Sequence, residues 1–277
     1  MSAGISQATP TPFAGFAFTT PAAQCFRRRV GAEVSDAAAQ AAWVRMLIDL
    51  ETSQSGEQLE GPGWLTRLCR AAGRTLSASG VGMTVITGAG LAGLTAASDA
   101  DAAKVEELQF TLGEGPCVDA VRSGRPVLTA DLGAAGGSKW PVYSAAAYEL
   151  GVRAVFAFPL QAGSVRMGAI DIYRGRSGPL NALEVADALA FAEVAMTGLL
   201  DGQAQAGDDV VPLVLLQGVD TRLEVHQAQG MVMIQLECSL SQAMARLRAF
   251  AFTADRSVSD VARDIVARKI VLERDPS

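Results

Sequence analysis

The stretch V-R-A-V-F-A-F-P-L-Q-A-G-S-V-R-M-G-A-I-D-I-Y, residues 152–173, consists of two apolar runs on either side of a short segment that contains a glycine. The runs are rich in the β-branched and aromatic residues of strands, and residues 161–164 supply the turn between them. Because side chains alternate along a strand, Asp171 and Tyr173 share one face of the second run, and the opposite face is apolar. The stretch therefore predicts an antiparallel hairpin. The predicted strands are residues 152–160 and 166–173.

Periodicity elsewhere indicates that helices bracket this hairpin. Before it, apolar residues recur every three or four positions from Asp36 onward and again over 65–76, and the period then changes to that of strands. After it, Asn181 and Glu184 form the cap of a further helix, whose apolar positions continue to Leu199. Helices on both sides of an antiparallel sheet indicate an α+β fold. The two further predicted strands are residues 81–87 and 91–97.

The motif L-G-E-G-P-C-V-D-A, residues 112–120, is typical of a sharp turn into a helix. Gly115 fits the cap position, and Pro116 fits the first turn, where its missing N–H has no cost. Cys117 then lies in the first turn, where the positive end of the helix can lower the pKa of the thiol and make it a sensor of oxidants. The alternative interpretation is a small buried residue. We expect the two acidic residues of the motif to cap and orient neighbouring groups rather than to catalyse.

The composition limits the classes of protein to which the chain can belong. The chain has 277 residues, of which 49% are hydrophobic and 19% are charged, so it can bury a core. No run approaches the roughly 18 apolar residues of a membrane span, and we expect a cytoplasmic protein without membrane contact. The four cysteines are far apart and there is one histidine, so neither a disulfide framework nor a metal site is predicted.

The last part of the chain carries the signals of three short helices. Each predicted helix begins with a capping pair, in which the first side chain accepts from a backbone N–H and the second reaches back. The pairs are Thr221 with Glu224, Ser239 with Gln242, and Ser257 with Asp260. Apolar positions at helical spacing follow each pair, which indicates a three-helix bundle.

Charge is unevenly distributed along the chain. The net charge is −6, yet residues 217–277 hold eight basic and eight acidic residues, so the whole excess lies before them. Residues 246–269 hold six basic and three acidic residues. This part of the bundle therefore carries a basic stripe, which suits an anionic partner.

Three segments of the bundle match a known module in residue type and spacing: H-Q-A-Q-G-M-V-M (226–233), S-Q-A-M-A-R-L-R-A-F-A-F (241–252) and V-A-R-D-I-V (261–266). They resemble the ANTAR module, a three-helix RNA-binding unit of bacterial transcription antiterminators. The preceding region, with the motif of residues 112–120, looks like the GAF sensor domain of actinobacterial GAF-ANTAR proteins. The resemblance implies a GAF-like antiparallel sheet flanked by helices and followed by a small all-α ANTAR bundle.

The predicted organisation has five parts. They are a flexible leader at 1–35, an N-terminal helix at 36–59, a GAF-like sensor domain at 60–202, a linker at 203–216 and an ANTAR-like RNA-binding domain at 217–273. The N-terminal helix and the helix after Asn181 both carry apolar stripes. We expect them to form the contact of a homodimer.

The resemblance implies a protein that promotes transcription antitermination by binding hairpin loops in nascent mRNA. Loops present bases that are splayed out, and basic side chains neutralise the phosphates. Small side chains allow helices to pack closely, and on a surface they leave room for a base. The expected RNA-binding residues are Ala228, Gln229, Gly230, Ala243, Arg246, Arg248, Ala251, Arg256, Ala262, Arg263, Arg268 and Lys269. Gln229 stands where the family often has lysine.

As the resemblance also implies, a GAF ligand pocket lies between the sheet and the segments that cover one of its faces. Aromatic walls with a few polar groups are typical of small-molecule sites. The expected ligand-binding residues are Cys117, Trp140, Tyr143, Phe156, Asp171 and Tyr173. The partner there is a small-molecule effector of unknown identity, and no resident cofactor is predicted.

Two other classes of function stay open. In the first, the protein is a signalling adaptor whose helical tail binds protein, in line with the neutral charge balance of residues 217–277. In the second, it is a GAF-type free methionine sulfoxide reductase, an enzyme that uses clustered cysteines. The sensor region holds only Cys69 and Cys117, and Cys69 is expected on the apolar face of a helix. We therefore expect no catalytic residues.

Overall fold

The computed structural model describes residues 37–55, 63–87, 90–206 and 220–273. The predicted leader at 1–35 and most of the predicted linker lie outside these residues, as does Cys25. The domain boundaries given above stay predictions.

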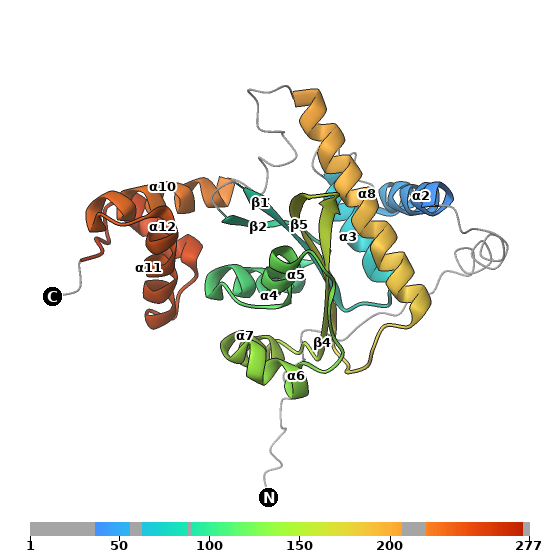
Figure 1. Cartoon of the computed structure of the whole chain (residues 1–277), viewed down its shortest axis with the longest axis horizontal. Helices are drawn as coiled ribbons and strands as arrows, with labels where there is room; N and C mark the ends of the chain where they lie inside the picture. The colour runs from blue at the N-terminus through green and yellow to red at the C-terminus, as the bar shows by residue number, and fades with distance from the viewer. Residues whose placement is uncertain (1–36, 56–62, 88–89, 207–219, 274–277) are drawn as a thin grey trace, which may run out of the picture.

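The centre of the structure is a five-stranded antiparallel sheet in the order β2-β1-β5-β4-β3 (Figure 1). The strands are β1 (Gly80–Thr87), β2 (Gly90–Ala97), β3 (Val127–Thr129), β4 (Ala154–Ala162) and β5 (Val165–Arg174). The predicted hairpin is confirmed as β4 and β5. The first strand begins later than predicted, at Ala154, and the turn is shorter, because it contains only Gly163 and Ser164. Gly163 has the positive φ of 59° that suits the first position of a type II′ turn.

Three helices cover one face of the sheet, as Figure 1 shows. They are α2 (Ala37–Ser55), α3 (Gly63–Thr75) and α8 (Ala182–Ala206). The predicted cap of α8 is confirmed, since the Asn181 side chain accepts from the N–H of Glu184 and the Glu184 carboxylate accepts from the N–H of Asn181. Trp43 of α2 meets Phe191 of α8 edge to face, with ring centroids 6.4 Å apart. Part of the apolar stripes expected at a dimer contact is therefore used within one chain.

Four helices cover the other face. They are α4 (Ala100–Leu112), α5 (Pro116–Ser123), α6 (Leu132–Lys139) and α7 (Pro141–Glu149). Helix α5 begins as predicted, with Gly115 as cap and Pro116 in the first turn. Helix α4 begins after Asp99, whose side chain accepts two backbone N–H groups, and ends at Gly113 in the left-handed conformation.

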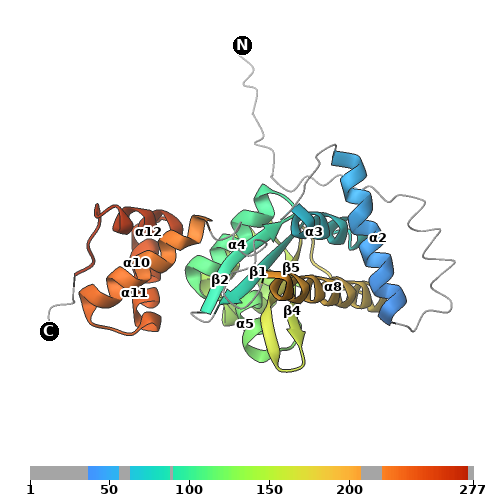
Figure 2. The same cartoon turned by 90° about the horizontal axis from the view of Figure 1, so that it is seen from above.

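The C-terminal residues form the predicted three-helix bundle, which lies beside α4 (Figure 2). Its helices are α10 (Asp220–Leu236), α11 (Leu240–Thr253) and α12 (Val258–Val266). The capping box of Ser239 and Gln242 is confirmed, and Ser257 accepts from the N–H of Asp260 as predicted. The predicted cap at Thr221 is wrong because α10 already includes Asp220. Aspartate and threonine both favour helix starts, so the sequence does not separate the two positions.

None of the helices that the structure describes is both long and apolar enough to span a membrane.

Candidate functional site

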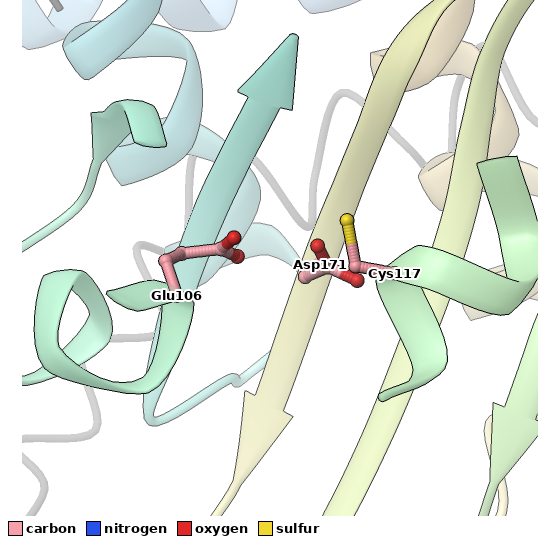
Figure 3. Close-up of side chains that lie close together, drawn as sticks. All are labelled: Glu106, Cys117 and Asp171. Carbon is pink, nitrogen blue, oxygen red and sulfur yellow. The ribbon is translucent and has the colours of Figure 1, made fainter. Parts of the chain in front are cut away.

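Three side chains with acidic or thiol groups meet between the sheet and its second layer of helices. Glu106 comes from α4, Cys117 from α5 and Asp171 from β5, and Figure 3 shows them gathered together. Their carboxylate oxygens and sulfur lie within 4.8 Å of one another, and all three residues are buried. We call these three residues the polar cluster.

A glycine on the neighbouring strand makes room for this cluster. Gly82 of β1 is the backbone partner of Asp171 on β5. A Cβ atom at Gly82 would collide with the side chain of Glu106. The absence of a side chain at Gly82 therefore allows α4 to insert a carboxylate next to the sheet.

Hydrogen bonds fix two members of the cluster. Glu106 accepts from the hydroxyl of Thr84 at 2.8 Å and from the hydroxyl of Tyr173 at 2.6 Å. The side-chain amide of Gln109 donates to the Tyr173 oxygen at 3.1 Å, and its own oxygen accepts from the backbone N–H of Cys117 at 2.8 Å. One network thus joins α4, β5 and the first turn of α5.

Asp171 is the member of the cluster whose hydrogen-bonding capacity is least satisfied. It is completely buried, and within the described part of the chain neither of its carboxylate oxygens has a hydrogen-bond partner. The same holds for the buried hydroxyl of Tyr143 on α7. Burial, and then the negative charge of Glu106, raise the pKa of Asp171 well above its ordinary value, and the Cys117 and Gln109 side chains offset this only in part. Because such burial is unfavourable for stability, it indicates a functional role for this residue.

Cys117 does not have the lowered pKa predicted from its place at a helix start. Its thiol is buried, and this burial, together with the nearby Asp171 carboxylate, raises the pKa well above the ordinary value of a cysteine. The helix dipole favours a thiolate by only about 0.3–1 kcal/mol, which is less than the cost of desolvating the charge. The structure thus agrees with the alternative interpretation of a buried cysteine.

The structure brings together five of the six predicted ligand residues. Those on the same side of the sheet are Cys117, Trp140, Tyr143, Asp171 and Tyr173. Phe156 instead packs into the apolar core on the opposite face, under α8. Side chains alternate along β4, so Val155 points toward the face under α4 to α7 and the next side chain, Phe156, points toward the opposite face.

The two acidic residues of the 112–120 motif orient neighbouring groups, as predicted. Glu114 accepts from the backbone N–H groups of Val142 and Tyr143 at 2.9 and 2.8 Å, and so caps the start of α7. Asp119 accepts from the indole N–H of Trp140 at 3.1 Å.

Sequence reasoning missed one member of the cluster, Glu106, and two residues that bind its network, Thr84 and Gln109. A signal was present, because Ala102, Val105, Glu106 and Gln109 are buried at the spacing of one helix face. Two polar residues on that face broke the apolar pattern by which helices are recognised.

In the bundle, the alanines expected to contact RNA fill the core. Those with no exposed surface are Ala228, Ala243, Ala251 and Ala262. Gln229 is also buried, and its side-chain amide donates to the carbonyl of Leu240 at 2.8 Å, which ties α10 to the first turn of α11. Gly230 differs, because an added Cβ would meet no atom within 4 Å. Close packing therefore accounts for the alanines.

Arg248 of α11 faces the sensor domain. Its Nε donates to the carbonyl of Phe110 at 3.0 Å, and its guanidinium carbon lies 5.7 Å from the centre of the Phe110 ring. This carbonyl is in the last turn of α4, where a cation interacts favourably with the helix dipole. Nearby, Ser259 of α12 donates to the Glu107 carboxylate at 3.1 Å. We call these contacts the α4 interface.

The other predicted cations lie on the surface of the bundle. Asp264 binds Arg256 at 2.7 Å and Lys269 at 3.3 Å, and Arg263 binds Asp260 at 2.9 Å. These pairs are exposed to solvent, and each contributes only about 0–1 kcal/mol to stability. The two remaining predicted cations, also exposed, are Arg246 and Arg268.

An exposed aromatic residue on the bundle was not predicted. Phe252 of α11 is 59% exposed, although phenylalanine is usually buried. Ala245 and Ala249, which are also exposed, precede it at helical spacing and lie on the same face of α11. The signal in the sequence was this second apolar stripe, which lies opposite the core stripe.

Comparison with protein families assigns both regions. The family model of the GAF domain matches residues 64–199, and that of the ANTAR domain matches residues 215–266. A comparison with curated proteins gave no match.

Several solved structures resemble the chain at low sequence identity. The type II free methionine-R-sulfoxide reductase from Thermoplasma acidophilum is 19% identical, with 56% of this chain and 94% of that chain covered and a TM-score of 0.39. The GAF domain of a phosphoenolpyruvate-protein phosphotransferase from Coxiella burnetii is 14% identical, with 60% and 97% covered and a TM-score of 0.43. The second GAF domain of DevS from Mycobacterium smegmatis is 22% identical, with 52% and 96% covered and a TM-score of 0.38.

The sheet and most of its covering helices fall in the first matched region, whereas α2 precedes it, and the three-helix bundle falls in the second region. The chain therefore has the GAF-ANTAR architecture, with a GAF domain followed by an ANTAR domain.

Proposed function

We propose that the protein is a signal-responsive RNA-binding regulator that promotes transcription antitermination by binding hairpin loops in nascent mRNA. The observation that carries this proposal is the order of the domains, because a signal-sensing GAF domain precedes an ANTAR domain, a module that binds RNA in antitermination. We expect it to act in the cytoplasm as a homodimer on paired hairpins. A dimer with two RNA-binding sites of modest affinity binds more tightly than one site, because binding at the first site raises the effective concentration of RNA at the second.

The outward face of α11 suits a base that is splayed out of a loop. Bases stack on exposed aromatic rings, and Phe252 offers such a ring next to the small side chains of Ala245 and Ala249. Arg256 lies shortly after Phe252 in the sequence, just beyond the end of α11. A phosphate can replace the carboxylate partner of this arginine, since exposed ion pairs are weak.

Helix α4 offers a physical route from the sensor domain to the bundle. Glu106 and Gln109 belong to the buried network, whereas Glu107 and Phe110 contact the bundle through the α4 interface. While Arg248 binds the Phe110 carbonyl, it is held against the sensor domain. We propose that an effector which displaces α4 releases Arg248 for RNA.

Each alternative function meets a specific observation. The adaptor gains support from the carboxylate partners of the basic residues, because these pairs lower the positive potential that RNA would meet. The reductase loses support from the position of Cys69, which is buried in the apolar core on the other face of the sheet from Cys117. We infer a regulator that acts without catalysis.

Fluorescence anisotropy of the full chain with a labelled RNA of two hairpins tests this function. The Phe252→Ala variant should bind about 10-fold more weakly, because one stacked base contributes about 1–3 kcal/mol. Leu128→Ala, which truncates an exposed apolar residue on β3, away from the expected dimer contact, is the matched control and should bind like the wild type. Absence of RNA binding by the wild-type chain would contradict the proposal and favour the adaptor.

A further inference from the structure

The polar cluster gathers donor atoms that favour a metal ion. A thiol and two carboxylates converge from α5, β5 and α4, and their donor atoms lie within 4.8 Å of one another. Independently, the buried hydroxyl of Tyr143 has no hydrogen-bond partner among the described residues. Tyr143 packs in the same buried cluster as Tyr173, whose own hydroxyl donates to Glu106.

We propose that the polar cluster binds one divalent transition-metal ion of the Zn²⁺, Fe²⁺ or Co²⁺ class, and that this ion is an effector of the sensor domain. The ligands are the Cys117 sulfur and the carboxylates of Asp171 and Glu106. A thiolate ligand selects this class over Mg²⁺ and Ca²⁺, which prefer oxygen ligands alone. The effector role rests on the RNA-binding function proposed above, whereas the site rests on its own geometry.

The ion would supply the positive charge that the cluster needs. Asp171 has two buried oxygens without hydrogen-bond partners among the described residues, and a metal ion satisfies both its charge and its lone pairs. On binding, the Cys117 thiol loses its proton to solvent and becomes a thiolate ligand. Thr84, which donates to Glu106, would orient that ligand as outer hydrogen-bond partners do in metal sites.

Three protein ligands leave one position of a tetrahedral ion open. Tyr143 lies nearby, and its unpartnered hydroxyl can donate a hydrogen bond to a water or small anion in that position. The site can therefore exchange its fourth ligand.

Metal binding would also move α4. In a tetrahedral site with bonds of about 2.0–2.3 Å, donor atoms lie about 3.5 Å apart. The donors here lie within 4.8 Å of one another, so binding would draw the more distant ones together by up to about 1 Å. Glu106 is pulled toward the sheet, and the next residue, Glu107, is the one that accepts from Ser259 of the bundle. The α4 interface thus lies one residue from the metal ligand.

Titration of the chelator-treated full chain with Co²⁺ tests the site. We expect one ion per chain and a thiolate-to-cobalt charge-transfer absorption. Cys117→Ala should abolish this absorption and weaken binding by about 100-fold or more, since loss of even an outer partner of a metal ligand costs about 10- to 100-fold. Cys69→Ala, which removes the other buried thiol of the sensor domain, is the matched control and should behave like the wild type.

Wild-type protein without a charge-transfer absorption would overturn the site, as would an absorption that survives in Cys117→Ala. This reading of the wild type does not depend on whether a variant folds. RNA anisotropy with and without Zn²⁺ then separates the two proposals. Metal binding with unchanged RNA affinity would overturn the effector role, and metal binding in a chain that binds no RNA would overturn the proposed function while the site stands.

Discussion

The two faces of the GAF sheet differ in kind. On the face under α2, α3 and α8, the sheet contributes apolar side chains such as Phe158 and Ile170 to a continuous core. On the face under α4 to α7, the same strand β5 contributes Asp171, a buried carboxyl beside a second carboxyl and a thiol. Burial of apolar side chains stabilises both faces, whereas burial of these three polar groups on the second face opposes stability. The difference supports the proposal that the second face holds the functional site.

The largest expected effect is on the apolar face. Phe158→Ala removes a fully buried ring and should lower the free energy of unfolding by about 3–5 kcal/mol. Urea denaturation followed by circular dichroism measures this change. A loss below about 1 kcal/mol would contradict the role assigned to this face.

A smaller loss is expected where the polar face is tightly packed. Gly82→Ala forces a Cβ into the Glu106 side chain and should cost about 1–3 kcal/mol. Gly73→Ala in α3 is the matched control, because its Cβ would meet only Val81 at the ordinary contact distance of 3.7 Å. This control should be neutral or more stable by up to about 1 kcal/mol. Equal losses in both variants would show that the close contact with Glu106 is not the reason for the loss in Gly82→Ala.

A gain in stability is expected at Asp171. In chelator-treated protein, Asp171→Asn should raise the free energy of unfolding by about 1 kcal/mol or more, because it removes the cost of burying an ionisable group without a partner. Asp264→Asn, which removes a partly exposed carboxylate from its ion pairs at the surface of the bundle, should be neutral or slightly destabilising. A marked loss of stability in Asp171→Asn would mean that the Asp171 carboxyl stabilises the fold, contrary to the account.

The smallest effect on stability is expected at the α4 interface. Glu107→Ala removes a hydrogen bond to Ser259 and should change the free energy of unfolding by less than about 1 kcal/mol. The same substitution should raise the affinity for RNA, because it weakens the α4 interface that restrains the bundle. Thermal denaturation and anisotropy on the same samples separate the two quantities.

The contrast between the faces also explains what the sequence could predict. The hairpin, the Asn181 cap and the three-helix bundle follow from local patterns, in which side chains close in sequence decide the outcome. The 112–120 motif likewise predicted the start of α5.

The polar cluster could not be predicted in the same way. Glu106, Cys117 and Asp171 lie far apart in sequence, and only the packing of α4 and α5 on β5 brings them together. Phe156 was placed with the ligand residues because its type suits a pocket, although strand alternation turns it to the other face. The alternation of β4 was visible in the sequence, but which face carries the ligand was not.

The most direct test of the account is the RNA affinity of the full chain when the α4 interface is broken. Phe110→Ala keeps the backbone carbonyl but removes the buried ring of α4 that packs into the core of the bundle and against Arg248. Circular dichroism verifies that the variant remains folded. The account predicts that this variant binds a two-hairpin RNA about 5-fold or more tightly than the wild type, within the usual range of coupling between sites. Leu128→Ala, the control on β3, should bind like the wild type. A folded Phe110→Ala variant with unchanged or weaker RNA affinity would contradict the claim that the sensor domain restrains the bundle through α4.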